Sequence, residues 1–109
     1  MSEVRRVVVQ YRTTPEHAEE NASLIEAVYA ALAREQPEDF RYATFRLADE
    51  TFVHVASIET ADGVNPLDTL PEFAAFSQGV AARCDGPPVA SPATLVGSYR
   101  LFNPKETLS

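Results

Sequence analysis

The hydrophobic and polar positions of this chain follow two kinds of pattern. Four stretches rich in β-branched and aromatic residues are typical of β-strands. They span residues 4–12, 40–48, 51–59 and 93–102. Two other stretches, 14–36 and 70–84, carry apolar side chains three or four positions apart, which predicts helices with one buried face. The predicted order of elements is therefore β-α-β-β-α-β.

The same four-residue signal, Thr-x-Pro-Glu, stands at the start of both helical stretches, at residues 13–16 and 69–72. A threonine oxygen can accept a first-turn amide, proline has no amide to leave unpaired, and glutamate can reach back to the start of the helix. The signal predicts a capped helix start in each half of the chain. Residues 60–68, with Gly63 and Pro66, are expected to be a loop.

Right-handed crossovers in this order predict a ferredoxin-like α+β fold with a four-stranded antiparallel sheet. The strands at 4–12 and 51–59 are expected in the middle, with both helices on one face. A chain of 109 residues is expected to form one domain, residues 1–109. Its core is predicted to span residues 4–102, followed by a polar tail at 103–109.

The strand residues suggest how the sheet uses its two faces. In the second strand we expect Ala43, Phe45 and Leu47 to face the helices. The residues expected to point the other way are Phe40, Tyr42, Thr44 and Arg46. Both faces of the third strand are largely apolar, which would expose a larger patch than monomers usually tolerate. Pairing of this face with a second copy would cover it, so the sequence predicts a homodimer whose sheets enclose a pocket.

Composition narrows the function classes. A formal charge of −7 without a basic cluster argues against nucleic acid as a partner. No leader-like segment or long apolar run is visible, so we expect a cytoplasmic protein with no membrane partner. The only histidines, His17 and His54, have no carboxylate or thiol at ligand spacing, and the single Cys84 has no adjacent base. We expect no metal site and no cofactor.

His54 is the strongest candidate for chemistry, because it lies between two valines in a predicted central strand. Such a histidine is either a hydrogen-bonded core residue or an acid or base in a pocket, and the sequence leaves both interpretations open. Tyr42 is the alternative proton acceptor. Candidate substrate-binding residues are Gln10, Arg46, Tyr99 and Phe76.

The strings TFVHVASIE, NPLDTLPEFAAFSQGVAARCDGPP and VGSYRLF resemble small bacterial proteins of the dimeric α/β-barrel superfamily, in particular the antibiotic biosynthesis monooxygenase-like domain. The resemblance implies two sheets facing each other across a dimer, with a ligand cavity between sheet and helices in each subunit. Members of that group include cofactor-independent oxygenases that act on polycyclic aromatic substrates and enzymes that degrade haem. The tryptophan that those oxygenases use is missing here, as is the Asn–Trp–His set of the haem degraders.

Two hypotheses follow. In the first, the dimer binds an apolar or aromatic small molecule and oxidises it without metal or flavin, with His54 or Tyr42 accepting a phenolic proton and Arg46 and Gln10 holding the developing oxyanion. In the second, the dimer is a non-catalytic ligand-binding or accessory protein. A step in ligand affinity at roughly pH 6–7 would favour the first hypothesis, and a flat profile the second.

Overall fold

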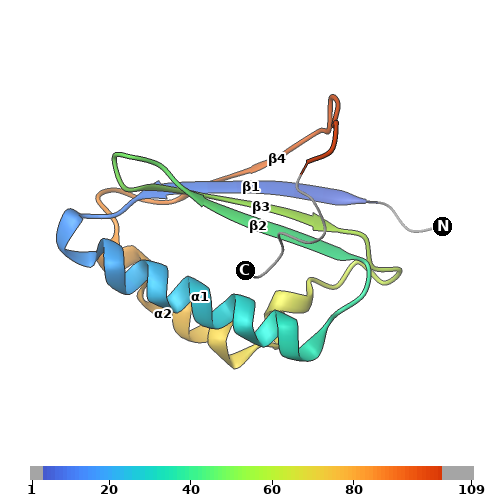
Figure 1. Cartoon of the computed structure of the whole chain (residues 1–109), viewed down its shortest axis with the longest axis horizontal. Helices are drawn as coiled ribbons and strands as arrows, with labels where there is room; N and C mark the ends of the chain where they lie inside the picture. Colours follow the sequence, from blue (N-terminus) through green and yellow to red (C-terminus); the bar gives the residue numbers. More distant parts are fainter. Residues whose placement is uncertain (1–3, 102–109) are drawn as a thin grey trace.

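A single antiparallel sheet lies over two helices in the computed structural model, which describes residues 4–101 (Figure 1). In chain order the elements are β1 (Arg5–Arg12), the 3-10 turn η1 (Pro15–His17), α1 (Ala18–Glu35), β2 (Phe40–Arg46), β3 (Thr51–Ile58), the 3-10 turn η2 (Pro66–Thr69), α2 (Pro71–Arg83) and β4 (Val89–Pro92). The strand order is β2-β3-β1-β4. The predicted ferredoxin-like fold, with β1 and β3 in the middle and both helices on one face, is confirmed.

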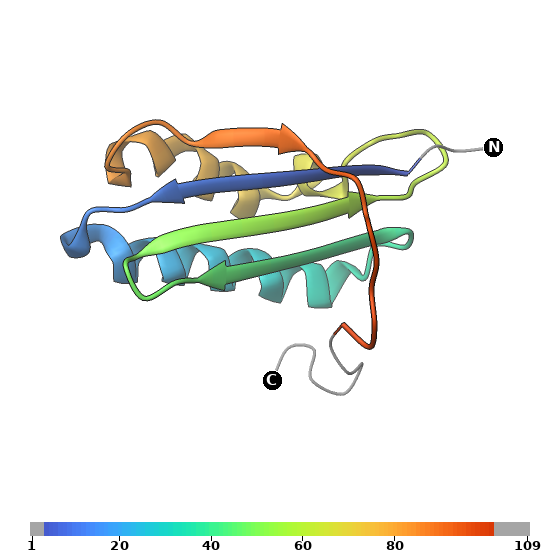
Figure 2. The ribbon, with the colours of Figure 1, turned by 90° about the horizontal axis from the view of Figure 1, so that it is seen from above.

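The predicted last strand at 93–102 is wrong. The strand is β4, and the chain after it leaves the sheet (Figure 2). Pairing with β1 begins directly after α2, where the Asp85 amide donates to the Arg12 carbonyl over 2.6 Å. By Ala93, whose amide donates to the Arg6 carbonyl over 2.9 Å, β4 has used nearly the whole length of β1. Residues 94–101 therefore have no strand left to pair with, and residue 102 and the predicted tail at 103–109 lie outside the described residues.

The predicted faces of β2 are also reversed. The register pairs Thr44 with His54 and Tyr42 with Ala56, and these four side chains share the face that looks toward the helices. Ala43 and Phe45 lie on the opposite face, and Leu47 lies just beyond the strand, exposed. The sequence misled because both faces of the sheet carry apolar residues. The hydroxyl groups of the tyrosine and threonine side chains find hydrogen-bond partners in the buried layer, so polarity alone did not identify the outer face.

The predicted capping by threonine is wrong at both helix starts. The Thr13 hydroxyl contacts the Glu50 carbonyl at 3.5 Å, and the Thr69 hydroxyl donates to the Pro66 carbonyl over 2.9 Å. Each proline does stand at the start of its helical segment, where its missing amide costs nothing. The expected loop at 60–68 runs into η2, where Asn65 Oδ1 accepts from the Leu67 amide over 3.0 Å.

The core lies between the sheet and the helices. Its buried apolar residues are Tyr11, Ile25, Val28, Ala31, Phe52, Leu67, Leu70 and Phe76. Within residues 4–101, no helix covers the other face of the sheet (Figure 1). That outer face carries the half-buried valines Val8, Val53 and Val55, and the segment after β4 exposes Val96 and Tyr99. No helix among residues 4–101 is both long and apolar enough to cross a membrane.

Candidate ligand cavity

A cavity of about 290 Å³ lies between the helix-facing side of the sheet and the segment η2–α2. Its walls come from β1, β2, β3, η2 and α2 and are mainly apolar. The lining residues are Arg5, Val7, Val9, Tyr11, Tyr42, His54, Ala56, Ile58, Asn65, Leu67, Phe73, Phe76, Ser77, Val80 and Pro88. The lining extends along β1 from the exposed Arg5 to the buried Tyr11, and the end at Tyr11 is here called the closed end.

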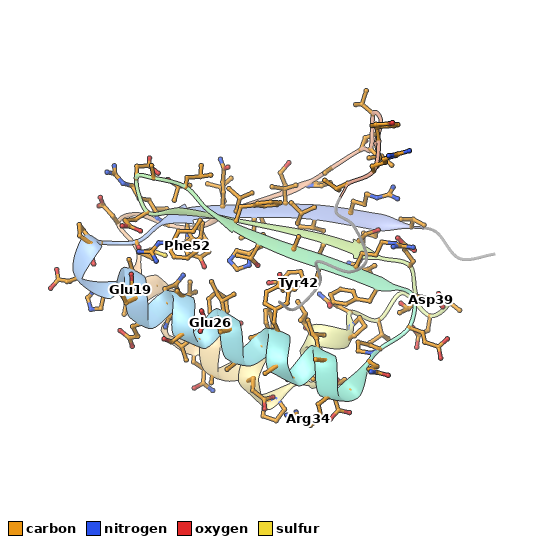
Figure 3. The ribbon with its side chains drawn as sticks, viewed as in Figure 1. Glu19, Glu26, Arg34, Asp39, Tyr42 and Phe52 are labelled. Carbon is orange, nitrogen blue, oxygen red and sulfur yellow. The ribbon has the colours of Figure 1, made fainter. Side chains whose placement is uncertain are left out.

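His54 sits at the closed end, 5% exposed, between two tyrosines. Its Nε2 lies 2.8 Å from the Tyr11 hydroxyl and its Nδ1 lies 2.8 Å from the Tyr42 hydroxyl. Both tyrosine rings stack on the imidazole, with centroid distances of 5.4 Å and 5.9 Å. Alternation along β3 points His54 to the same side as Phe52, which Figure 3 shows between the sheet and the helices.

The hydrogen bonds continue from Tyr11 into the helices. Asn21 of α1, fully buried, donates from Nδ2 to the Tyr11 oxygen over 3.0 Å. Arg83 at the end of α2 donates from Nε to Asn21 Oδ1 over 2.9 Å and from Nη2 to the Phe76 carbonyl over 2.8 Å. Arg83 is 4% exposed, and its guanidinium also lies 5.2 Å from the centre of the Phe76 ring. A buried cation therefore anchors one end of the network.

On the other side of His54 the network ends in hydroxyl groups. Thr44 Oγ1 lies 3.1 Å from Nδ1 of His54, and the Tyr29 hydroxyl lies 2.8 Å from Thr44 Oγ1. The Tyr42 hydroxyl contacts the same nitrogen of His54, Nδ1, at 2.8 Å. Of these three hydroxyl-bearing residues, only Tyr42 lines the cavity.

Burial keeps the imidazole and phenol groups of this network uncharged at neutral pH. It lowers the pKa of His54 from 6.5 to about 4 and raises the pKa of Tyr11 and of Tyr29 to about 12. Burial is also the main cause that raises the pKa of Tyr42. Neutral imidazole and neutral phenol groups are therefore what the closed end of the cavity presents to a ligand.

The structure brings together three of the six residues proposed from the sequence: His54, Tyr42 and Phe76 all line the cavity. Gln10 pairs with Val53 and lies on the outer face of the sheet.

Arg46 lies outside the cavity lining, where its Nε contacts Glu50 at 2.7 Å and its Nη2 contacts Glu19 at 3.0 Å. Tyr99 is 82% exposed in the segment after β4. The proposed oxyanion partners of His54, Arg46 and Gln10, are thus not beside it.

Five members of the network were not among the site residues proposed from the sequence: Tyr11, Asn21, Tyr29, Thr44 and Arg83. Asn21 and Arg83 did leave a signal, because each interrupts an apolar helix face: Asn21 is four residues before Ile25, and Arg83 is seven after Phe76. A polar residue in such a stripe is expected to have a buried partner. Within residues 4–101, no group of three or more histidine, cysteine or acidic side chains is placed to hold a metal ion.

Comparison with known proteins shows the fold. No family model matches the chain. No curated protein matches it either.

Solved structures do match. A proposed antibiotic biosynthesis monooxygenase from Nitrosomonas europaea aligns with a TM-score of 0.70 and 13% identity, covering 88% of this chain and 93% of that one. A second proposed monooxygenase of this kind, from Caulobacter crescentus, aligns with a TM-score of 0.70 and 16% identity, covering 88% of this chain and 92% of that one. SnoaB, a cofactor-independent oxygenase from Streptomyces nogalater, aligns with a TM-score of 0.64 and 17% identity, covering 89% of this chain and 97% of that one. The chain thus has the fold of antibiotic biosynthesis monooxygenase-like proteins, as the sequence resemblance implied.

Proposed function

We propose that this protein is a homodimer that binds a small apolar or aromatic molecule in the cavity between its sheet and α2. The observation that carries the proposal is the contrast within that cavity. Its walls are formed by side chains such as Val9, Ala56 and Val80, and its closed end holds the neutral pair His54 and Tyr42. Apolar walls with a few convergent polar groups are the usual construction of a small-molecule site.

The outer face of the sheet supports the homodimer. Val8, Val53 and Val55 lie on neighbouring positions of β1 and β3, are half-buried in the single chain, and have no helix above them. A two-fold pairing of this face would use one patch twice and remove it from water. Arg6 and Arg41 lie on the same face, at its edge, where a polar rim of such an interface is expected.

The binding proposal is tested by filling the cavity. Ala56 lines the cavity and is 9% exposed, so Ala56→Leu places additional atoms in the space for the ligand. We expect tetralin, a bicyclic hydrocarbon, to bind the wild type and to bind this variant at least tenfold more weakly in a calorimetric titration. Ala75→Leu, on the exposed side of α2, is the matched control and should bind as the wild type does. Equal binding by both variants, or no binding to the wild type, would contradict the proposal.

A second candidate function is oxygenation of a phenolic ligand without a cofactor. The favouring observation is that His54 is neutral between two tyrosines, so an imidazole nitrogen can take a proton once a ligand displaces a tyrosine hydroxyl. SnoaB, which shares the fold, is a cofactor-independent oxygenase.

In such a reaction the phenolate donates electrons to molecular oxygen. One oxygen atom becomes bonded to a ring carbon, which gives a quinone. The other oxygen atom takes two hydrogen atoms of the substrate and is released as water.

An oxygen electrode tests this candidate. With α-naphthol as substrate, the reaction predicts consumption of one oxygen molecule per quinone formed. A pKa of about 4 makes His54 a weak base, so we expect slow turnover that His54→Gln abolishes. If the wild type binds naphthol and consumes no oxygen, the protein is a binding protein.

A further inference from the structure

The buried hydrogen bonds that start at Arg83 have a fixed order of donor and acceptor, which we call their direction. A guanidinium can only donate, so the Asn21 oxygen must be the atom that accepts from Arg83 Nε. This orients the Asn21 amide, and its nitrogen donates to the Tyr11 oxygen. Arg83 itself is held by its second bond, to the Phe76 carbonyl, and by close packing against Gly79, where a Cβ atom would lie 2.7 Å from Arg83 Nη1.

The same direction continues through His54. Because the Tyr11 oxygen accepts from Asn21, the Tyr11 proton is free to donate to His54 Nε2, the acceptor it contacts at 2.8 Å. The neutral imidazole then carries its single proton on Nδ1. That proton is donated to the hydroxyl oxygen of Tyr42 or Thr44, which lie 2.8 Å and 3.1 Å away. The opposite tautomer would give Tyr11 two donors and leave its own buried proton without an acceptor.

This direction leaves a hydroxyl proton without an acceptor at the cavity. Tyr42, Thr44 and Tyr29 carry three hydroxyl protons, and one hydroxyl–hydroxyl contact, between Thr44 and Tyr29, takes one of them. His54 Nδ1 is a donor and takes none of the three. Among residues 4–101, no backbone carbonyl or carboxylate accepts a hydrogen bond from these hydroxyls. The Tyr42 proton therefore has no acceptor in the network, and Tyr42 lines the cavity.

We propose that the cavity selects ligands that carry an acceptor oxygen, such as a ketone or quinone, which the Tyr42 hydroxyl binds as a donor, and that Arg83 and Asn21 are the positioning residues that set this direction. The inference rests on the proposed ligand-binding function and specifies the class of ligand. It gives the buried Arg83–Asn21 pair a role in specificity at a site it does not touch.

A single isosteric change reverses the direction. Asn21→Asp replaces the donor nitrogen by a carboxylate oxygen that only accepts, and the pair with Arg83 keeps the carboxylate charged. Tyr11 must then donate to residue 21, so His54 Nε2 becomes the donor to Tyr11 and Nδ1 becomes an acceptor. Nδ1 now accepts the proton of Tyr42, the closer of its two hydroxyl neighbours at 2.8 Å. Tyr42 then has no proton to donate to a ligand.

Nitrogen-15 NMR of the histidine side chains tests the direction without any ligand. We expect His54 in the wild type to show a protonated Nδ1 and an unprotonated Nε2, and the two assignments to exchange in Asn21→Asp. His17, whose Nδ1 contacts the Thr14 hydroxyl at 2.7 Å and which is not a member of the network, serves as the internal control and should not change. A wild-type His54 protonated on Nε2 would overturn the inference, even if the variant does not fold.

A matched pair of probes tests the consequence for binding. We expect α-tetralone, which adds one acceptor oxygen to tetralin, to bind the wild type about tenfold more tightly than tetralin does, as one neutral hydrogen bond would give. In Asn21→Asp and in Tyr42→Phe the ratio of the two dissociation constants should fall to about one. Equal wild-type affinities for the two probes would overturn the inference and leave the binding function intact. Failure of both probes to bind would instead count against the proposed function.

Discussion

The two faces of one sheet are used in opposite ways. On the helix side of β3, Phe52 and His54 are 2% and 5% exposed, and every polar atom of the imidazole has a partner. One residue along, Val53 and Val55 point away from the helices and are only half-buried. Neighbouring residues of a single strand therefore differ in their surroundings: the inner ones pack in the core or line the cavity, and the outer ones form the face proposed to pair with a second copy of the chain.

In this fold one face of the sheet contributes both to stability and to the proposed ligand specificity. The inner face combines the core with the proposed site, so its polar residues are fixed by buried partners as far away as Arg83. On the outer face the polar contacts among the described residues are short-range: Glu59 accepts a hydrogen bond from Ser57 and pairs with Arg41 at one end of β3. Changes on the inner face should alter folding and ligand preference together, whereas changes on the outer face should alter assembly.

The largest difference between the faces is expected from truncating adjacent residues. Phe52→Ala should lower the free energy of unfolding by about 4 kcal/mol, since it removes a fully buried ring that stacks on Tyr11. Val53→Ala, the matched control on the outer face, should cost less than about 1 kcal/mol in the monomer. Urea denaturation of both variants measures the contrast. Similar losses would mean that the outer face is as well packed as the core.

The buried cation should give the next largest effect. Arg83→Met keeps the length of the side chain but leaves Asn21 Oδ1 and the Phe76 carbonyl without their donor, which should cost about 3 kcal/mol. Arg34→Ala removes an arginine whose ion pairs with Glu35 and Glu72 are exposed, and should leave the unfolding free energy almost unchanged. The urea denaturation midpoints of the two variants measure this difference. Equal effects would show that Arg83 is not an anchor of the network.

Patterns along the chain predicted the fold but not the inner network, and the reason is physical. Strand and helix periodicity depends on neighbours in sequence, and it located the elements through β3 and α2. The register of β4 depends on where α2 returns the chain to β1, which no local pattern encodes. The network joins Tyr11, Asn21, His54 and Arg83 from four different elements, so only the folded chain shows that they meet.

The outer face is tested by placing a charge in its centre. Val55→Lys should raise the dissociation constant of the proposed homodimer about 100-fold, because an ammonium group would be buried without a partner near Arg6 and Arg41. Sedimentation velocity over a range of concentrations measures this. Thr69→Lys, on the exposed turn η2, is the control and should not change the dimer. A wild type that stays monomeric at every concentration would contradict the role assigned to this face.

The smallest effect expected is the response of the inner face to pH. Burial lowers the pKa of folded His54 to about 4, whereas the unfolded chain should titrate near 6.5, so the unfolded state binds more protons between these values. The contribution of the neutral histidine to stability is therefore fully present above pH 6.5 and is lost as the pH falls toward 4, by about 1 kcal/mol per pH unit. His54→Gln does not titrate, and the difference in unfolding free energy between wild type and variant should show this slope.

Ligand affinity should not follow the same curve at neutral pH. The step at roughly pH 6–7 considered from the sequence requires a histidine that titrates there, and the cavity holds His54 neutral throughout that range. Titration of α-tetralone into the wild type at pH 6, 7 and 8 should therefore give dissociation constants within about twofold of one another. A step in that interval would mean that His54 is solvated in the ligand-free protein. An affinity that does not change with pH is compatible with both a carrier and an oxygenase, because both can hold a neutral imidazole. Oxygen consumption with a phenolic ligand then distinguishes the two functions.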